Sequence, residues 1–181
     1  ACLRLDTEAA LAGLGMSEES LFFTDALLGP QRIRLQDVGG DFALRRSDGV
    51  VAYQLAVSFD DAAMGVSAVL RGNDLLASTP RQILIHRLLG HSPPQYAHLP
   101  LVVDHLGERL AKRHSGLSLS SLRQAGVAPR AVTGYLGFLA GWLDRPCKAS
   151  PEEILPVYSL KQLGKSLPPI PDDIIKLLLA L

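Results

Sequence analysis

Residues 66–103 read VSAVLRGNDLLASTPRQILIHRLLGHSPPQYAHLPLVV, and their pattern indicates a strand, a helix and a second strand in that order. Residues 66–70 are a compact apolar run, typical of a buried strand. The Thr-Pro pair at 79–80 predicts a helix with the threonine as N-cap and the proline at the first helical position, and Gly90 predicts its end. Residues 99–103 predict the next strand. Short connections in this order imply a right-handed crossover and parallel pairing, and therefore an α/β fold.

The segment before this stretch carries weaker signals. Up to about residue 50, short apolar runs at 21–23, 33–35 and 42–45 alternate with glycine-containing turn signals. This pattern predicts short strands and hairpins. Residues 50–59 fit a strand by composition and a helix by spacing, so periodicity leaves both open.

From about residue 118 the pattern becomes helical. Ser118 or Ser120 is suited to cap a short helix that ends at Gly126, and residues 129–142 predict a longer helix. The tail that follows is rich in proline and allows only short helical pieces. We therefore expect a small helical region after the α/β part.

Composition limits the class of protein. The chain has 181 residues, enough for one domain with an appendage. Its 48% hydrophobic and 20% charged residues exclude a disordered chain. Eighteen basic and eighteen acidic residues cancel, so a polyanion must be held by a local cluster and not by the overall charge. Apolar runs stay below the ~18 residues of a membrane helix, so we expect no membrane segment. The chain starts at Ala1 without a methionine, so we expect a fragment or a processed chain.

The cysteines and histidines give no metal-binding pattern. Cys2 and Cys147 lie far apart and form no CxxC pair, which argues against a disulfide framework or a zinc knuckle. The five histidines have no paired spacing with cysteine or carboxylate. We therefore expect no metal site in these residues and a reducing, cytoplasmic location.

The densest cationic cluster is at residues 109–114, RLAKRH, after an apolar run and a turn. Arg109, Lys112 and Arg113 place three charges within five residues, which suits a clamp on phosphate groups. The alternative is a solvated charge run before a helix. These residues alone leave both interpretations open.

Several motifs, in order, resemble the glutamyl branch of the class I aminoacyl-tRNA synthetases. Residues 109–113 resemble the KMSKS signature in its KLSKR form, with Ala111 where that signature usually has serine. The other matching segments are YQLAV at 53–57, DD at 60–61, MGV at 64–66, VLRGNDLL at 69–76, STPRQ at 78–82 and YAHLPL at 96–101. The resemblance covers roughly residues 20–175, and within the branch it favours the shortened glutamyl-queuosine tRNA(Asp) synthetases.

The resemblance implies a division of the chain. Residues 1–117 would be the C-terminal part of a Rossmann-like nucleotide-binding domain with its KMSKS-type loop, and residues 118–181 a helical region that contacts the tRNA stem. The HIGH motif and the zinc-binding cysteines of the family would lie in a missing N-terminal half. We therefore expect the fragment to be inactive or nearly so on its own.

The resemblance also implies an activity. The intact enzyme would use Mg-ATP to activate glutamate and transfer it to tRNA, in the first place to queuosine of tRNA(Asp). Alternatives are a truncated glutamyl-tRNA synthetase that charges tRNA(Glu), or a non-catalytic module that binds tRNA or a protein partner. No membrane partner is expected, and the pattern makes no prediction for the oligomeric state.

The resemblance assigns the ATP contacts to the second half of the α/β part. Lys112 matches the second lysine of KMSKS and is expected to hold the pyrophosphate, with Arg109 and Arg113 in support. The backbone around His98, Leu99 and Leu101 would bracket the adenine.

The glutamate pocket is expected to contain Tyr53 and Arg71. Arg71 follows a predicted strand, and ligands gather at the carboxyl edge of parallel sheets, where a guanidinium can bind a carboxylate with two hydrogen bonds. Without the motif, Arg71 would be a surface ion pair and Tyr53 a core residue. Asp74 is a further candidate, for contact with the pocket or with the tRNA acceptor end.

Overall fold

The structure is a computed structural model that describes residues 1–108, 110 and 117–181. Its contacts divide the chain into two compact units, Ala1–Leu99 and Pro100–Leu181. The domain boundary inferred from the sequence, at residue 117, remains a proposal.

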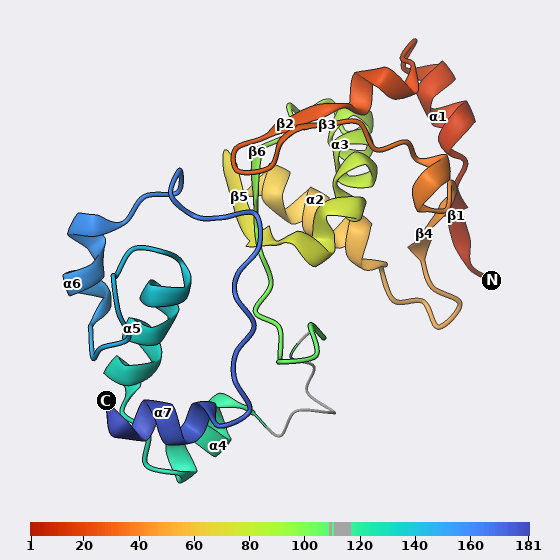
Figure 1. Cartoon of the computed structure of the whole chain (residues 1–181). Helices are drawn as coiled ribbons and strands as arrows, with labels where there is room; N and C mark the ends of the chain where they lie inside the picture. The colour runs from red at the N-terminus through yellow and green to blue at the C-terminus, as the bar shows by residue number, and fades with distance from the viewer. Residues whose placement is uncertain (109, 111–116) are drawn as a thin grey trace. The chain divides into compact units, whose positions relative to one another are not determined.

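The first unit is built around one parallel strand pair. Strand β5 (Ala68–Gly72) pairs with β6 (Gln95–Leu99), in register from Ala68 opposite Gln95 to Gly72 opposite Leu99. The 3-10 turn η3 (Asn73–Ser78) and helix α3 (Thr79–Leu88) connect the two strands. The predicted order of strand, helix and parallel strand is thus confirmed (Figure 1).

The ends of these elements differ from the sequence prediction. Strand β6 ends at Leu99, where the predicted strand began, because Pro100 follows and proline has no N–H for a ladder. Ser78 is the N-cap of α3, so Thr79 is the first helical residue and the proline the second. The predicted N-cap was therefore wrong by one residue. Gly90 does follow the helix, with a φ of 76°.

The segment at residues 50–59, which the sequence left open between strand and helix, is mostly helical. Residues 53–63 form helix α2 (Tyr53–Ala63), which packs against α3. The side chain of Gln54 donates to Ser78 Oγ at 2.9 Å and accepts from Gln82 at 2.9 Å. These two bonds fix the first turn of α2 to the start of α3.

The first 50 residues contain two antiparallel pairs and an unpredicted helix. Strand β1 (Leu3–Leu5) pairs with β4 (Phe42–Arg45), and β2 (Phe23–Asp25) forms a hairpin with β3 (Gly29–Gln31). Helix α1 (Thr7–Gly13) begins at Asp6, whose carboxylate accepts from Ala9 N. The predicted strand at 33–35 is absent, and the short 3-10 turns are η1 (Glu18–Leu21) and η2 (Gln36–Val38).

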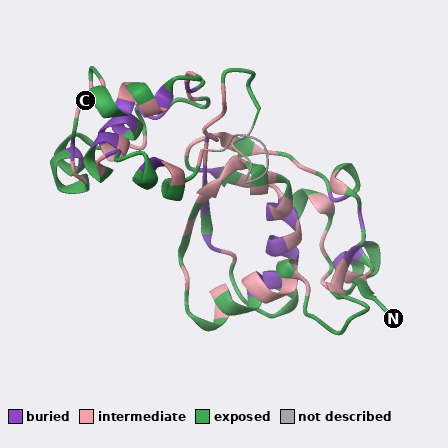
Figure 2. Ribbon diagram, turned by 90° about the horizontal axis from the view of Figure 1, so that it is seen from below, coloured by how far each residue is buried: buried purple, intermediate pink, exposed green. Residues whose placement is uncertain are grey.

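The hairpin lies beside β6. Ala26 N donates to the carbonyl oxygen of Tyr96 at 2.9 Å, which joins the β2–β3 turn to the parallel pair. Figure 2 shows buried residues in purple. One cluster of buried apolar side chains in this unit joins α1, α3, β6 and the segments next to the hairpin; its members are Leu11, Leu21, Leu35, Ile83, Leu84 and Tyr96.

The second unit is helical. Its elements are α4 (Leu119–Gln124), α5 (Pro129–Leu139), α6 (Pro151–Ile154), η4 (Leu155–Val157) and α7 (Ile174–Ala180). Ser118 caps α4 and accepts from Ser121 N at 3.0 Å, so it is the cap and not Ser120. Helix α5 ends at Leu139, three residues earlier than predicted.

The core of the second unit is formed by apolar side chains from α4, α5 and α7 and from the loops just before α5 and α7. They are Leu122, Val127, Ala131, Tyr135, Leu139, Ile170, Ile174 and Leu178. Gly134 lets α5 approach the backbone of residues 147–149, where Ala149 N donates to Arg130 O at 3.0 Å. In the part of the chain that is described, no helix is long and apolar enough to cross a membrane.

Candidate active site at the carboxyl ends of β5 and β6

Arg71 and His98 lie opposite each other near the carboxyl ends of the parallel strands. The pairing register of β5 and β6 therefore brings together two residues that are 27 positions apart in the sequence. This edge of an α/β sheet is where ligands commonly bind, because the chain leaves the sheet there in loops. The edge is the first place to look for a site in this unit.

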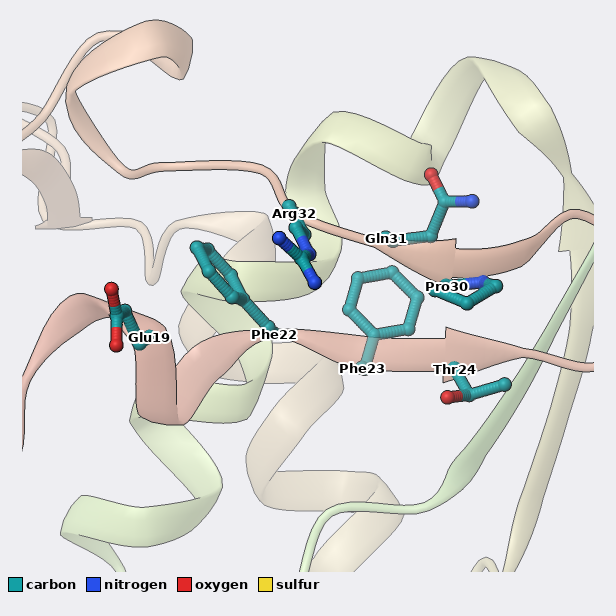
Figure 3. A pocket seen from close by; sticks show the side chains of 7 residues that line it. All are labelled: Glu19, Phe22, Phe23, Thr24, Pro30, Gln31 and Arg32. Atoms are coloured by element: carbon teal, nitrogen blue, oxygen red, sulfur yellow. The ribbon is translucent and has the colours of Figure 1, made fainter.

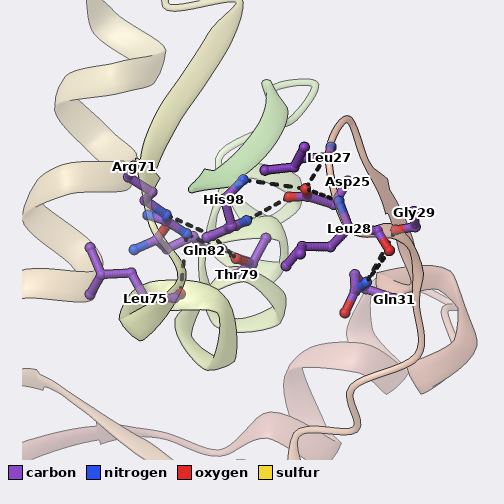
Figure 4. A network of polar contacts seen from close by, with 10 residues as sticks. All are labelled: Asp25, Leu27, Leu28, Gly29, Gln31, Arg71, Leu75, Thr79, Gln82 and His98. Carbon is purple, nitrogen blue, oxygen red and sulfur yellow. Dashed lines mark hydrogen bonds and ion pairs between the residues drawn. The ribbon is translucent and has the colours of Figure 1, made fainter. Parts of the chain in front are cut away.

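Arg71 is held by neutral acceptors. Its Nε donates to His98 Nε2 at 3.0 Å and its Nη1 to Gln82 Oε1 at 2.7 Å. Its Nη2 donates to Thr79 Oγ1 at 2.9 Å and, more weakly, to the carbonyl oxygen of Leu75 at 3.5 Å (Figure 4). These bonds use four of the five N–H donors of a guanidinium and leave its positive charge in place. The result is a cation in a fixed orientation.

Behind Arg71 lies a buried aspartate and histidine pair. The side chains of His98 and Asp25 are both 0% exposed, and His98 Nδ1 lies 2.6 Å from Asp25 Oδ2. Asp25 Oδ1 accepts from the backbone N–H groups of Leu27, Leu28 and His98 at 2.9–3.2 Å. The carboxylate at the hairpin turn is therefore bonded through both of its oxygens (Figure 4).

Burial and hydrogen bonding set the charges of this pair. Burial alone would raise the pKa of Asp25, but the bonds from His98 and from three backbone amides hold that pKa below its ordinary value. Burial lowers the pKa of His98, and this outweighs the opposing effect of its bond to Asp25. Asp25 is thus a carboxylate and His98 a neutral imidazole at pH 7.

The network extends to α2 through two amide side chains. Gln82 accepts from Arg71 and donates to Gln54 at 2.9 Å, and Gln54 in turn donates to Ser78. Tyr53 precedes Gln54 at the start of α2, and its side chain is 52% exposed. The first turn of α2 therefore borders the network and presents an exposed phenol.

Comparison with protein families identifies the chain. Residues 12–154 match the family described as tRNA synthetases class I (E and Q), catalytic domain. The chain belongs to this family.

Curated relatives agree with this membership. The chain is 48% identical over 160 residues to a glutamyl-Q tRNA(Asp) synthetase of Symbiobacterium thermophilum, covering 88% of this chain and 49% of the relative. It is 50% identical over 153 residues to the protein of the same name from Nitratidesulfovibrio vulgaris, covering 84% and 47%. A glutamate–tRNA ligase of a Synechococcus strain is 43% identical over 118 residues, covering 65% and 25%. The chain thus spans about half the length of the glutamyl-Q relatives.

A solved structure supports the fold. A glutamate tRNA ligase from Elizabethkingia meningosepticum superposes with a TM-score of 0.71 at 22% identity, covering 87% of this chain and 35% of that chain. The predicted α/β fold, with class I synthetases as its structural relatives, is thereby confirmed.

In this synthetase family member, the predicted site residues are placed as follows. Arg71 and His98 meet in the network, and Leu99 is the last residue of β6. Asp74 is exposed in η3, and its charge acts on His98. Leu101 belongs to the second unit and is half-buried.

The predicted ATP clamp is not part of the described structure. Arg109, Lys112 and Arg113 lie outside the described residues. The KMSKS-type motif therefore remains a prediction from the sequence. Within ranges 1–108, 110 and 117–181, no group of three or more His, Cys, Asp and Glu side chains is arranged to hold a metal ion.

The sequence analysis gave no role in a site to several residues of the network, among them Asp25, Thr79 and Gln82. Thr79 and Gln82 are buried polar residues on α3, and the threonine, read only as part of a helix start, accepts from Arg71. Asp25 was not considered. The available signal was the run Asp25-Ala-Leu-Leu-Gly29, since aspartate before a glycine-containing turn often bonds backbone amides two and three residues ahead.

A hollow lies on the hairpin. It has a volume of about 420 Å³ and is lined by residues before and along β2 and along β3: Glu19, Phe22, Phe23, Thr24, Pro30, Gln31 and Arg32 (Figure 3). It combines two aromatic rings with one acidic and one basic side chain. None of the residues that bond Arg71 lines it, so it is distinct from the network.

Proposed function

We propose that this chain forms the second part of the catalytic region of an ATP-dependent ligase that activates glutamate and transfers it to tRNA. The observation that carries the proposal is the Arg71 cation, held by neutral groups at the carboxyl edge of the parallel pair. The similarity to proteins named glutamyl-Q tRNA(Asp) synthetase supports the choice of glutamate. Because the chain spans about half of those relatives, the activity is proposed for a protein that contains the other half as well.

Arg71 is proposed to bind a carboxylate of glutamate. One Nη1 hydrogen is not used by the four bonds described above, and the 3.5 Å bond from Nη2 to Leu75 is the weakest of them. A carboxylate could take both of these N–H groups and leave the bonds to His98, Gln82 and Thr79 intact. Tyr53 is proposed as a second contact, because its exposed phenol lies on the turn of α2 next to the network.

The chemistry would be formation of an acyl adenylate. A glutamate carboxylate oxygen attacks the α-phosphorus of ATP, the bond from that phosphorus to the oxygen that bridges it to the β-phosphorus breaks, and pyrophosphate leaves. Negative charge grows on the departing oxygens, so a fixed cation beside them lowers the barrier. Lys112 is proposed for this role, with Arg109 and Arg113 in support, and the backbone at His98, Leu99 and Leu101 for the adenine.

The first experiment measures adenylate formation. In the full-length protein, Lys112→Ala is expected to slow glutamate-dependent exchange of pyrophosphate into ATP by about 10²–10³-fold. Lys161→Ala, an exposed lysine of the helical unit, is the control and should leave exchange unchanged. Normal exchange in Lys112→Ala would favour a non-catalytic module that binds tRNA or a protein.

The second experiment identifies the acceptor. We propose queuosine of tRNA(Asp), because the two relatives with 48% and 50% identity carry that name. Labelled glutamate should therefore be attached to queuosine-containing tRNA(Asp) and not to tRNA(Glu). The reverse result would assign the chain to the glutamate–tRNA ligases, to which it is 43% identical in one case.

A further inference from the structure

We propose that Asp25 and His98 are positioning residues that fix the guanidinium of Arg71 for substrate. This inference rests on the proposed function, since it assumes that Arg71 binds glutamate. The contact chain runs from the hairpin turn through the imidazole to the arginine: Asp25 Oδ2 to His98 Nδ1 at 2.6 Å, and His98 Nε2 to Arg71 Nε at 3.0 Å. All of it lies inside the first unit.

The direction of each hydrogen bond follows from chemistry. Arginine can only donate, so His98 Nε2 must be the unprotonated nitrogen that accepts from Arg71. A neutral imidazole then carries its proton on Nδ1, which donates to the carboxylate of Asp25. The aspartate thereby selects the one tautomer of His98 that can hold the arginine.

The aspartate itself cannot turn away. Its Oδ1 accepts from three backbone amides, those of Leu27, Leu28 and His98. These bonds lie at a turn and at a strand, so the carboxylate plane is fixed by the backbone. Oδ2 is the oxygen that remains for the imidazole.

One edge of the guanidinium is held by two acceptors. Its Nε bonds His98 and its Nη2 bonds Thr79 Oγ1, and those two acceptor atoms lie 3.3 Å apart. The ring of Tyr96 lies under the guanidinium, with its centre 5.1 Å from the central carbon, and stacks with the imidazole. This edge is fixed to the protein, so the Nη1 and Nη2 end is the one presented to a ligand.

Asp25→Asn is the decisive substitution, because it preserves the shape of the side chain and reverses the direction of its hydrogen bond with His98. The three amide donors require the asparagine oxygen at the Oδ1 position, which places its NH₂ group against His98 Nδ1. The imidazole must then accept at Nδ1 and carry its proton on Nε2. That proton faces the N–H of Arg71, so the guanidinium loses its partner and its orientation.

The kinetic experiment uses the full-length protein. Asp25→Asn is expected to raise the KM for glutamate by about 10- to 100-fold, while the KM for ATP changes less than twofold. His86→Gln is the matched control: this histidine is also buried, 1% exposed, but has no hydrogen bond to Arg71 among the described residues. It should leave both constants unchanged.

A spectroscopic experiment tests the tautomer directly. With ¹⁵N-labelled histidine, the His98 ring of the wild type should show a protonated Nδ1 and an unprotonated Nε2, and Asp25→Asn should reverse them. His98→Gln assigns the signal by removing it. A wild-type His98 that is protonated on Nε2 overturns the inference, whether or not any variant folds.

The outcomes separate this inference from the function on which it rests. If Arg71→Leu raises the KM for glutamate and a folded Asp25→Asn does not, the positioning role is wrong and the proposed function stands. If neither changes that KM, the assignment of Arg71 to glutamate fails. If both raise it and the tautomer reverses, both proposals are supported.

Discussion

The two units differ in what they bury. Among the described residues, every buried polar side chain lies in the first unit: Thr7, Asp25, Ser58, Thr79, Gln82, His86 and His98. The core of the helical unit is formed by apolar and aromatic side chains. A buried polar group destabilises a protein unless it is hydrogen-bonded. Four of these seven side chains, those of Asp25, Thr79, Gln82 and His98, belong to the network around Arg71. The comparison therefore places the hydrogen-bonded network around Arg71 in the first unit.

The largest expected effect is the loss of the central cation. Arg71→Leu in the full-length protein should reduce kcat/KM for glutamate by about 10²–10³-fold, because it removes the charge and leaves the partners of Arg71 unpaired. Arg87→Ala, an exposed arginine on α3, is the control and should retain activity. An active Arg71→Leu would place the glutamate site elsewhere.

The stability of the helical unit should decrease when a side chain is added where its backbone segments pack closely. An alanine Cβ at Gly134 would lie 1.9 Å from the carbonyl oxygen of Cys147 and 2.8 Å from Ala149 N. Gly134→Ala should therefore reduce the free energy of unfolding of this unit by about 1–3 kcal/mol. The fluorescence of Trp142, the single tryptophan, should report a lower urea midpoint.

A glycine without close neighbours provides the contrast. A Cβ added to Gly13 in α1 would have nothing within 4 Å, so Gly13→Ala should stabilise the first unit by about 0.5–1 kcal/mol. If Gly134→Ala were as well tolerated as Gly13→Ala, the result would contradict the close packing of α5 against residues 147–149.

Acid should destabilise the first unit before the second. Burial lowers the pKa of His86 below its ordinary value. The nearby charge of Asp61 raises this pKa and that of His91 lowers it, and both effects are smaller than the effect of burial. Burial also lowers the pKa of His98, which faces Asp25, Arg71 and the charge of Asp74.

The sign of the pH dependence follows from proton binding. In the unfolded chain both histidines titrate near pH 6.5, so below that pH the unfolded state binds more protons. Stability is therefore complete above about pH 6.5 and falls as the pH decreases through the folded-state pKa, by at most about 1.4 kcal/mol per pH unit for each histidine.

The dependence of stability on pH can be measured by proteolysis in urea at pH 7.5 and 5.5. Cleavage at sites in the first unit reports the unfolding of that unit. His86→Gln should reduce the dependence on pH, and Trp142 fluorescence should change less over the same range. Equal acid sensitivity of the two units would contradict the assignment of the dependence to these histidines.

The smallest expected effect concerns a helix cap. Ser118→Ala removes the acceptor for Ser121 N and should destabilise the helical unit by about 1 kcal/mol. Ser120→Ala, in the first turn of α4, should be neutral or slightly stabilising, because alanine favours helix. The difference between the two urea midpoints tests which serine is the cap.

Much of the first unit could be predicted from local pattern. The apolar run before Arg71, the Thr-Pro pair at 79–80 and Gly90 predicted β5, α3 and the parallel crossover, because these signals act within a few residues. Residues 50–59 could not be assigned. Side-chain bonds join Gln54 to Ser78 and Gln82, which lie more than 20 positions away, and local periodicity carries no trace of such contacts.

Two residues of the network were named from the sequence. Arg71 and His98 were named for separate ligands, glutamate and ATP, but the register of β5 and β6 makes them partners. Asp25 was not recognised, because no periodicity relates a hairpin turn to a strand 73 positions further along the chain.

The amino acids alone were sufficient for the fold class and the family resemblance, because propensity, apolar spacing and motif order can be read along the chain. The role of Arg71 in binding glutamate stays a prediction. Which atoms surround that arginine, and the tautomer of the histidine beside it, depend on three segments meeting in space. Hydrogen bonds between buried groups are specific to distance and direction, and folding of the hairpin against β6 is what establishes both.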